Sequence, residues 1–207
     1  MDDPFHLRQH GITDTAVLEA FRKVDRSLFI DVSIRSFATV DEPLPIGEGQ
    51  TISQPSLVAH MTQILEIKPN HHILEIGTGS GFQTAIMAKI ARKVTTIEVI
   101  PVLYEMSKKR LADLGFENVS VILGDGHEGY ESHAPYDGIM VTAATPEIPE
   151  KLIDQLKDGG RMVIPLGEQY ATQRLMVISK NDDGSLTKKK EMWVRFVPFV
   201  KTDSSVK

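Results

Sequence analysis

The stretch ILEIGTGSGF, residues 73–82, decides the fold, because it joins a short apolar segment to three glycines at alternate positions. Residues 73–76 predict a buried strand, and residues 83–91 predict a helix. A strand, a glycine turn and a helix form the first half of a βαβ unit. Glycine permits a tight turn and lets a ligand approach the main chain. The free N–H groups at the start of the helix then lie beside that ligand.

An acidic residue adds to this pattern. Glu98 lies near the end of the next predicted strand, residues 93–99. An acid about 20 residues after such a glycine turn is placed to accept hydrogen bonds from a ribose. The glycines alone are also compatible with a purely structural turn. Together with the strand, the helix and Glu98, they favour nucleoside binding, and their GxGxG spacing differs from the GxGxxG of dinucleotide-binding proteins.

The composition excludes several classes of function. The 207 residues include 41% apolar and 25% charged residues, which is ordinary for a globular protein. A net charge of −5 without a basic cluster argues against a nucleic-acid partner. The chain has no cysteine, and its histidines lack the spacing of zinc ligands, so we expect no metal. We find no signal peptide and no membrane-spanning run, and we expect no membrane partner and a cytoplasmic location.

Strands and helices alternate along most of the chain. This order predicts an α/β fold: a doubly wound, mostly parallel Rossmann-like sheet with a C-terminal antiparallel hairpin. We divide the chain into an N-terminal helical extension (1–70), the Rossmann-like core (71–200) and a polar tail (201–207). The further predicted strands are 119–123, 136–142, 161–165, 174–179 and 186–196, and the further helices are 101–115 and 149–157.

The N-terminal extension contains a second candidate site. We expect Thr13 to cap a first helix and residues 27–49 to be irregular. Pro55 suits the first turn of another helix, so Ser53 stands at or next to its N-cap. Ser53 can simply cap this helix, or its hydroxyl and that of Thr51 can bind a carboxylate at the helix N-terminus.

A third candidate follows the predicted strand 119–123, where Asp125 and Gly126 stand. Ligands of doubly wound sheets bind beyond the carboxyl ends of the strands, so Asp125 can meet the base of a nucleoside. An ordinary Asp-Gly turn is the alternative interpretation.

Four segments carry a family resemblance. The chain resembles class I S-adenosylmethionine-dependent methyltransferases and, more narrowly, the protein-L-isoaspartate O-methyltransferases. QTISQP is the specific mark, since many methyltransferases share the glycine motif. The resemblance covers nearly the whole chain, to about residue 200. The segments are LPIGEGQTISQPSLVAHM (44–61), ILEIGTGSGFQTA (73–85), YDGIMVTAATPEIPEKLIDQLKDGGRMVIPLG (136–167) and RFVPF (195–199).

The resemblance implies a protein repair enzyme. It would transfer methyl from S-adenosylmethionine to the free carboxylate of isoaspartyl residues in damaged proteins and peptides, leaving S-adenosylhomocysteine. It implies that Ser53 is catalytic and that the peptide contacts Thr51, Ile52, Gln54, Val197 and Pro198. The implied cofactor contacts are Glu75, Gly77, Thr78, Gly79, Ser80, Gly81, Glu98, Asp125 and Gly126. We expect the enzyme to be a monomer.

The sequence departs from the family pattern at two places. Phe82 stands where many relatives have a tyrosine or tryptophan. Residues 38–41 lack an aromatic residue that relatives often have, and this second departure bears on peptide binding.

The sequence also leaves rival functions open. One rival is a methyltransferase for a small-molecule carboxylate. Another is a non-catalytic adaptor that keeps the fold and binds damaged protein. A nicotinamide enzyme is disfavoured by the glycine spacing.

Overall fold

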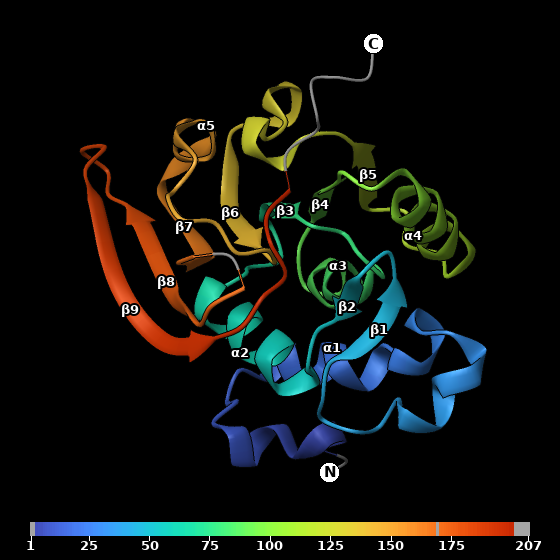
Figure 1. Cartoon of the computed structure of the whole chain (residues 1–207). Coiled ribbons are helices and arrows are strands. Elements are labelled where there is room, and N and C mark those ends of the chain that lie inside the picture. The colour runs from blue at the N-terminus through green and yellow to red at the C-terminus, as the bar shows by residue number, and fades with distance from the viewer. Residues whose placement is uncertain (1–2, 169, 201–207) are drawn as a thin grey trace.

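A seven-stranded sheet forms the centre of the computed structural model, which describes residues 3–168 and 170–200 (Figure 1). The strand order is β5-β4-β3-β6-β7-β8-β9; β3 to β7 are parallel, and β8 and β9 are antiparallel additions. The predicted fold class is thus confirmed, whereas the predicted tail lies outside the described residues. The strands are β3 (His72–Ile76), β4 (Lys93–Glu98), β5 (Val119–Leu123), β6 (Tyr136–Val141), β7 (Leu156–Leu166), β8 (Gln173–Lys180) and β9 (Leu186–Val194).

The strand order reverses between β3 and β6. From β3 the chain proceeds through β4 and β5 toward one edge, and then returns to β6 on the other side of β3. Ile76, at the end of β3, pairs with Ile97 of β4 and Val141 of β6. The connections after β3 and β6 leave in opposite directions, which opens a crevice at the carboxyl ends of the strands.

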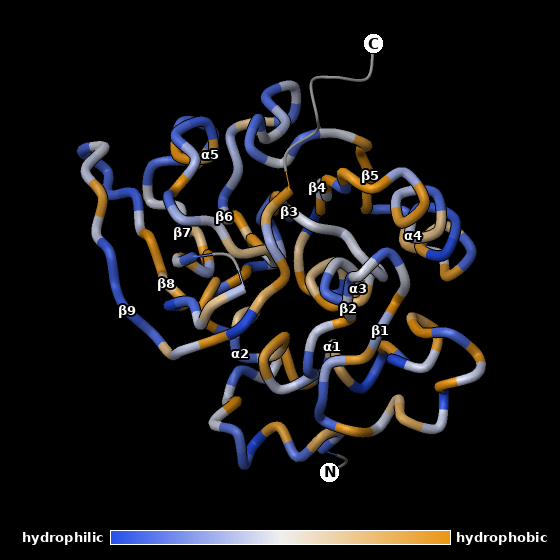
Figure 2. The backbone as a smooth tube through the Cα atoms, in the orientation of Figure 1, coloured by the Kyte–Doolittle hydropathy of each residue, from blue (hydrophilic) through white to orange (hydrophobic). Residues whose placement is uncertain are grey.

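Helices cover both faces of the sheet. Along β3, Ile73 packs into the cluster formed with α1, α2 and α3, whereas Leu74 packs into the opposite cluster with α5. Successive residues of a strand point to opposite faces, so an almost continuously apolar strand supplies both cores. Figure 2 shows hydrophobic residues on the central strands and a mainly hydrophilic β9. The helices are α1 (Thr15–Lys23), α2 (Pro55–Leu65), α3 (Phe82–Ala88), α4 (Pro101–Asp113) and α5 (Glu150–Asp154).

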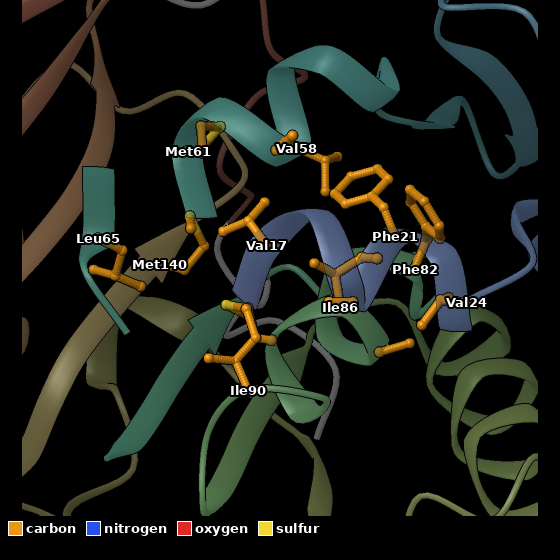
Figure 3. Packing of buried hydrophobic residues seen from close by; sticks show 14 of the residues in the cluster. Val17, Phe21, Val24, Val58, Met61, Leu65, Phe82, Ile86, Ile90 and Met140 are labelled. Carbon is orange, nitrogen blue, oxygen red and sulfur yellow. The ribbon is translucent and has the colours of Figure 1, made fainter. Parts of the chain in front are cut away.

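Phe82, the departure from the family pattern, joins the N-terminal extension to the core. It is 1% exposed and makes edge-to-face contacts with Phe21 at 5.8 Å and Phe29 at 5.6 Å between ring centroids. Figure 3 shows Phe82 beside Phe21 among residues from α1, α2 and α3. A phenyl ring fits here because a hydroxyl in this apolar contact would need a buried partner.

The segment 27–49 is not irregular, as we expected, but holds short helices and a hairpin. The 3-10 helices η2 (Arg26–Phe29) and η3 (Val32–Phe37) each begin after an aspartate, Asp25 or Asp31, whose carboxylate accepts a main-chain N–H two residues on. Such local side-chain bonds need no apolar periodicity, so the sequence pattern did not reveal these turns. The remaining 3-10 helices are η1 (Pro4–His10), η4 (Gly126–Glu128) and η5 (Glu131–His133).

The hairpin of β1 (Leu44–Gly47) and β2 (Gln50–Ile52) places the first part of the predicted substrate segment on a strand. Its turn residues, Glu48 and Gly49, have φ of 53° and 69°. A two-residue turn with positive φ at both positions matches the twist of a hairpin, and glycine adopts it without strain. The strand alternation leaves Thr51 exposed and buries Ile52.

Several element boundaries differ from the predictions, among them the start of the predicted strand 161–165, which begins at Leu156 as β7. Asp14, and not Thr13, caps α1, because its carboxylate accepts the N–H groups of Ala16 and Val17. The predicted helix 149–157 ends at Asp154, since Leu156 already pairs with Tyr136 as the first residue of β7. Helix α3 ends at Ala88 and not at residue 91. Among the described residues, no helix has the length and apolar character needed to cross a bilayer.

The buried side chain of Arg26 holds several backbone segments of the N-terminal extension together. Its guanidinium donates hydrogen bonds to the carbonyls of Ala38 (3.2 Å), Val40 (2.9 Å), Glu42 (2.7 Å) and Ser53 (3.2 Å). Burial lowers the pKa of Arg26 to about 10, which still leaves it charged at neutral pH. One side chain therefore ties residues 38–42 to the segment that carries Ser53.

We expect Arg26→Met to lower the free energy of unfolding by about 3 kcal/mol, because buried carbonyls lose charge-assisted donors. Residues 38–53 should also become sensitive to limited proteolysis. Chemical denaturation and mapping of the cleavage sites measure both effects. Lys23→Met, which removes an exposed cation from the same region, is the control. Equal stability of the two variants would contradict this role for Arg26.

Candidate active site

A cavity lies at the carboxyl ends of β3, β4 and β6. The turn after β3 forms one wall, and Glu98 with the start of α4 forms another. Residues 197–200 and residues 50–52 of the β1–β2 hairpin also line this cavity. The predicted cofactor residues that line this cavity are Gly77, Thr78, Gly79, Ser80, Glu98 and Gly126.

The turn can take its shape because of its glycines. Gly77 and Gly79 have φ of 93° and 53°, which disfavour any other residue. A Cβ on Gly77 would lie 2.5 Å from the Thr142 hydroxyl oxygen. A Cβ on Gly79 would meet only Ile46, at 3.4 Å, so the main chain there is open to a ligand.

Glu98 holds the tip of this turn. Its Oε2 accepts the N–H of Gly79 at 2.7 Å, and its Oε1 accepts the N–H groups of Val99 and Ile100, both at 3.0 Å. The side chain is 4% exposed. A carboxylate offers about four lone-pair positions, so it can still accept hydrogen bonds from a ligand. This arrangement suits a diol such as that of a ribose.

Three of the predicted cofactor residues do not line the cavity. Glu75 lies in the core beneath the turn, with 0% exposure. Gly81 is the N-cap of α3, where a Cβ would meet Leu111. Asp125 caps η4, with its carboxylate 2.9 Å from Nδ1 of His127. Asp125 therefore caps a turn in this structure, and its neighbour Gly126 lines the cavity.

Ser53 does not cap α2. The N-cap is Gln54, which makes no capping bond with its side chain. Asp41 supplies the missing acceptor: its Oδ1 accepts the N–H of Ser56 at 2.7 Å, and its Oδ2 accepts from Nε2 of Gln54 at 2.9 Å. Burial acts to raise the pKa of Asp41, but these hydrogen bonds outweigh it and lower the pKa. Within the described part of the chain, the Ser53 hydroxyl makes no hydrogen bond.

This first cavity adjoins two further cavities, which share part of its lining. Thr51 and Val197 line all three, and Ser53 lines the first and the second. The second extends past His60 toward the end of β9, and the third extends past Tyr170. Ile52 faces the first cavity, Gln54 the second, and Pro198 the first and third.

The sequence reasoning missed several residues of this region. Asp41 and Arg26 support the segment around Ser53 but lie 12 and 27 positions before it. Thr142, which lines the first cavity, donates its hydroxyl to the carbonyls of Ile76 and Gly77. The only signal for Asp41 was its place in the segment that departs from relatives. Among the described residues, no group of three or more histidine or acidic side chains could hold a metal ion.

Comparison with known proteins decides the family. The family model described as "Protein-L-isoaspartate(D-aspartate) O-methyltransferase" matches residues 5–204. The protein-L-isoaspartate O-methyltransferase 2 of Archaeoglobus fulgidus is 49% identical over 195 residues, which cover 93% of this chain and 88% of the relative. This chain belongs to the protein-L-isoaspartate(D-aspartate) O-methyltransferase family.

Other relatives agree with this assignment. The protein-L-isoaspartate O-methyltransferase 2 of Polaromonas sp. is 50% identical over 185 residues, covering 89% of this chain and 88% of that one. A putative protein-L-isoaspartate O-methyltransferase from Plasmodium falciparum, solved with S-adenosyl-L-homocysteine, matches with a TM-score of 0.80 and 27% identity over 98% of this chain and 100% of that chain. A longer chain of known structure, described as a protein-L-isoaspartate O-methyltransferase, matches with a TM-score of 0.86 and 30% identity. The match covers 94% of this chain and 63% of that chain.

Family membership settles the activity. The chain is an S-adenosylmethionine-dependent methyltransferase of the protein-L-isoaspartate type, and its reaction serves protein repair. The family resemblance that the sequence motifs indicated is therefore confirmed, as is the cofactor.

We expect Glu98→Gln to weaken binding of S-adenosylhomocysteine about 10–100-fold, because hydrogen bonds to a charged acceptor are lost. Isothermal titration calorimetry measures the affinity, and circular dichroism verifies the fold. Glu105→Gln on α4 removes an exposed acid and is the matched control. NAD should not compete for the site. Unchanged affinity in Glu98→Gln, or tight NAD binding, would count against this assignment of the cavity.

Proposed function

We propose that methyl transfer takes place where the three cavities meet, between the glycine turn and Ser53. Residues 71–200 supply the cofactor site, and residues 1–70 supply most of the substrate site. S-adenosylmethionine, when bound, supplies an electrophilic methyl group on a positively charged sulfur. In this proposal Glu98 binds the ribose hydroxyls, and the main chain of Gly77 to Ser80 binds the methionine part. Gly126 then bounds the adenine.

The single observation that carries the proposal is the unused hydroxyl of Ser53 at the junction. The capping of α2 by Asp41 leaves this hydroxyl available to a ligand. It can donate to one oxygen of a substrate carboxylate and leave the other oxygen free to attack the methyl carbon. The exposed side chain of Thr51 lies beside the same junction and can assist.

The second and third cavities provide room for the peptide on both sides of the isoaspartyl residue. Val197 and Pro198 separate these spaces from the cofactor cavity, and Ala144 fixes them by a hydrogen bond to the Val197 carbonyl at 2.8 Å. Gln54 faces the second cavity. Since every residue of the proposed site comes from one chain, we further propose that the enzyme acts as a monomer on isoaspartyl proteins and peptides.

The reaction needs positioning more than proton transfer. A free α-carboxyl group has a pKa of about 3.3–3.7, so it is ionised at neutral pH without help from a base. The sulfur leaves as a neutral thioether and needs no proton. Aligning the two reacting atoms can account for about 7–11 kcal/mol of the barrier. Ser53, the glycine turn and residues 197–198 supply that alignment.

We expect strong selectivity for isoaspartyl over aspartyl peptides. The free carboxylate of an isoaspartyl residue sits one methylene closer to the peptide branch than that of aspartate. A displacement of about 1 Å can reduce the rate on the order of 10²-fold. Methylation of matched peptide pairs, measured with radiolabelled S-adenosylmethionine, tests this. Small carboxylic acids added as competitors test the rival acceptor class, and equal methylation of both peptides would refute the proposal.

We expect the rate of methyl transfer to be nearly independent of pH between 6 and 8. His60 lines the second cavity and His127 the third, so these histidines are the candidates for a general base. Burial lowers the pKa of His60, the nearby Glu191 offsets this only partly, and Lys189 lowers it further, so the structure favours the neutral form of this ring. Replacement of either histidine by glutamine should cause a modest loss, whereas Ser53→Ala should slow transfer without a new pH dependence.

Single-turnover rates at saturating cofactor measure this profile. The wild type, Ser53→Ala, His60→Gln and His127→Gln are compared across the same buffers. A tenfold rise per pH unit that disappears with one histidine would show that a general base is required.

A further inference from the structure

Glu75 is a buried acid that the proposed reaction does not use. It lies in the middle of β3, pairs with Thr96 of β4 and Met140 of β6, and is 0% exposed. Its side chain points to the face of the sheet that α3 covers, where Thr84 meets it. No ion pair of Glu75 occurs among the described residues.

Both hydrogen bonds of Glu75 involve one oxygen. Thr84 of α3 and Thr96 of β4 donate their hydroxyls to Oε2, the latter at 2.7 Å, whereas Oε1 is buried without a partner. The lone hydroxyl hydrogen of Thr96 is used in this bond. In the contact of 2.7 Å between the hydroxyls of Thr78 and Thr96, the donor must therefore be Thr78.

Thr78 belongs to the glycine turn and lines the cofactor cavity. A chain of hydrogen bonds thus runs from this turn, through Thr96, to Glu75, and a second branch reaches α3 through Thr84. Without an acceptor at Glu75, Thr96 could turn its hydrogen toward Thr78. The Thr78 hydroxyl would then lose its acceptor inside a 4% exposed side chain.

We propose that Glu75 is a positioning residue for the cofactor site, acting as an uncharged hydrogen-bond acceptor that orders Thr78 through Thr96. A carboxylate that is fully buried without a cation is strongly unfavourable. The proton of the neutral acid lies on Oε1, which has no partner, so that Oε2 accepts both threonine hydroxyls. A buried O–H without a partner costs less than a buried charge without one. The neighbours from α3, β4 and β6, which are Thr84, Thr96 and Met140, carry no charge. The charged group whose field reaches Glu75 is Glu98, and its negative charge favours the neutral form further.

Glu75 and Glu98, the two acids next to the glycine turn, therefore have different roles. Glu98 is the anion that holds Gly79 and faces the ligand, and Glu75 is the neutral acceptor beneath Thr78. Burial raises the pKa of Glu75 to about 8, in agreement with this division. Glutamine should replace Glu75 well, because its amide oxygen can accept both threonine hydroxyls. Leucine should not, because it has a similar size but no acceptor.

The first test is the affinity for S-adenosylhomocysteine, measured by calorimetry at pH 7. Glu75→Gln should bind within about twofold of the wild type, and Glu75→Leu about tenfold more weakly, the equivalent of one buried hydrogen bond. Tyr136→Phe is the control: it removes a partly buried hydrogen bond, from the Tyr136 hydroxyl to the Tyr130 carbonyl, at the start of β6. It should lower stability without changing the affinity.

The second test is pH dependence, which does not require Glu75→Leu to fold. Unfolded chains lose the Glu75 proton near pH 4.5, and the folded protein keeps it up to about pH 8. Stability contributed by this group is therefore lost as pH rises through that window. The melting temperature of the wild type should fall relative to Glu75→Gln between pH 5 and 8. Above pH 8 the affinity of the wild type for S-adenosylhomocysteine should also fall relative to that of Glu75→Gln.

The outcomes separate this inference from the proposed function on which it rests. If Glu98→Gln leaves the affinity unchanged, the proposed cofactor cavity fails. If Glu98→Gln weakens binding but Glu75→Leu binds like the wild type, only the role of Glu75 fails. An equal loss of affinity in Glu75→Gln and Glu75→Leu would also contradict the role of Glu75. So would a wild-type affinity and melting temperature that stay constant relative to those of Glu75→Gln as the pH changes.

Discussion

The structure depends on the turn after β3, where the main-chain N–H and C=O groups must keep hydrogen-bond partners. At this point a buried parallel strand ends between two neighbours, and its N–H and C=O groups must find partners away from water. Gly77 and Thr78 donate to the carbonyl of Ile97, and Thr142 donates to the carbonyl of Ile76. Gly79 donates to Glu98. The turn is thus held from both neighbouring strands, and its open side faces the cavity.

The same requirement shapes the substrate side. The first N–H groups of α2 need an acceptor, and the adjacent serine is the usual source of one. Here Asp41 reaches the helix from an earlier segment, and Arg26 holds that segment by its carbonyls. Capping from a distance releases the Ser53 hydroxyl for a ligand. In the proposed function, the hydroxyl that binds the substrate is thus left free by a structural contact in which it takes no part.

The hydrogen-bond donors around two buried acids decide which of them carries the negative charge. Glu75 and Glu98 flank one turn, and two anions so close would repel each other in a medium of low dielectric constant. Three backbone N–H groups stabilise the carboxylate of Glu98, and only hydroxyls reach Glu75. Two glutamates of the same sequence motif thus serve as an anion and as a neutral acceptor.

Local patterns in the sequence determined much of this protein. The apolar strand, the glycine spacing and the acid at Glu98 predicted the sheet and the nucleoside site, because each depends on a few consecutive residues and on repeating side-chain direction. The QTISQP segment placed Ser53 beside a helix N-terminus but left its role open. Only the tertiary structure assigned the cap to Asp41, buried Glu75 and brought Thr51 and Val197 to one junction. These features depend on contacts between residues far apart in the chain and on the solvent that those contacts exclude, neither of which a local pattern records.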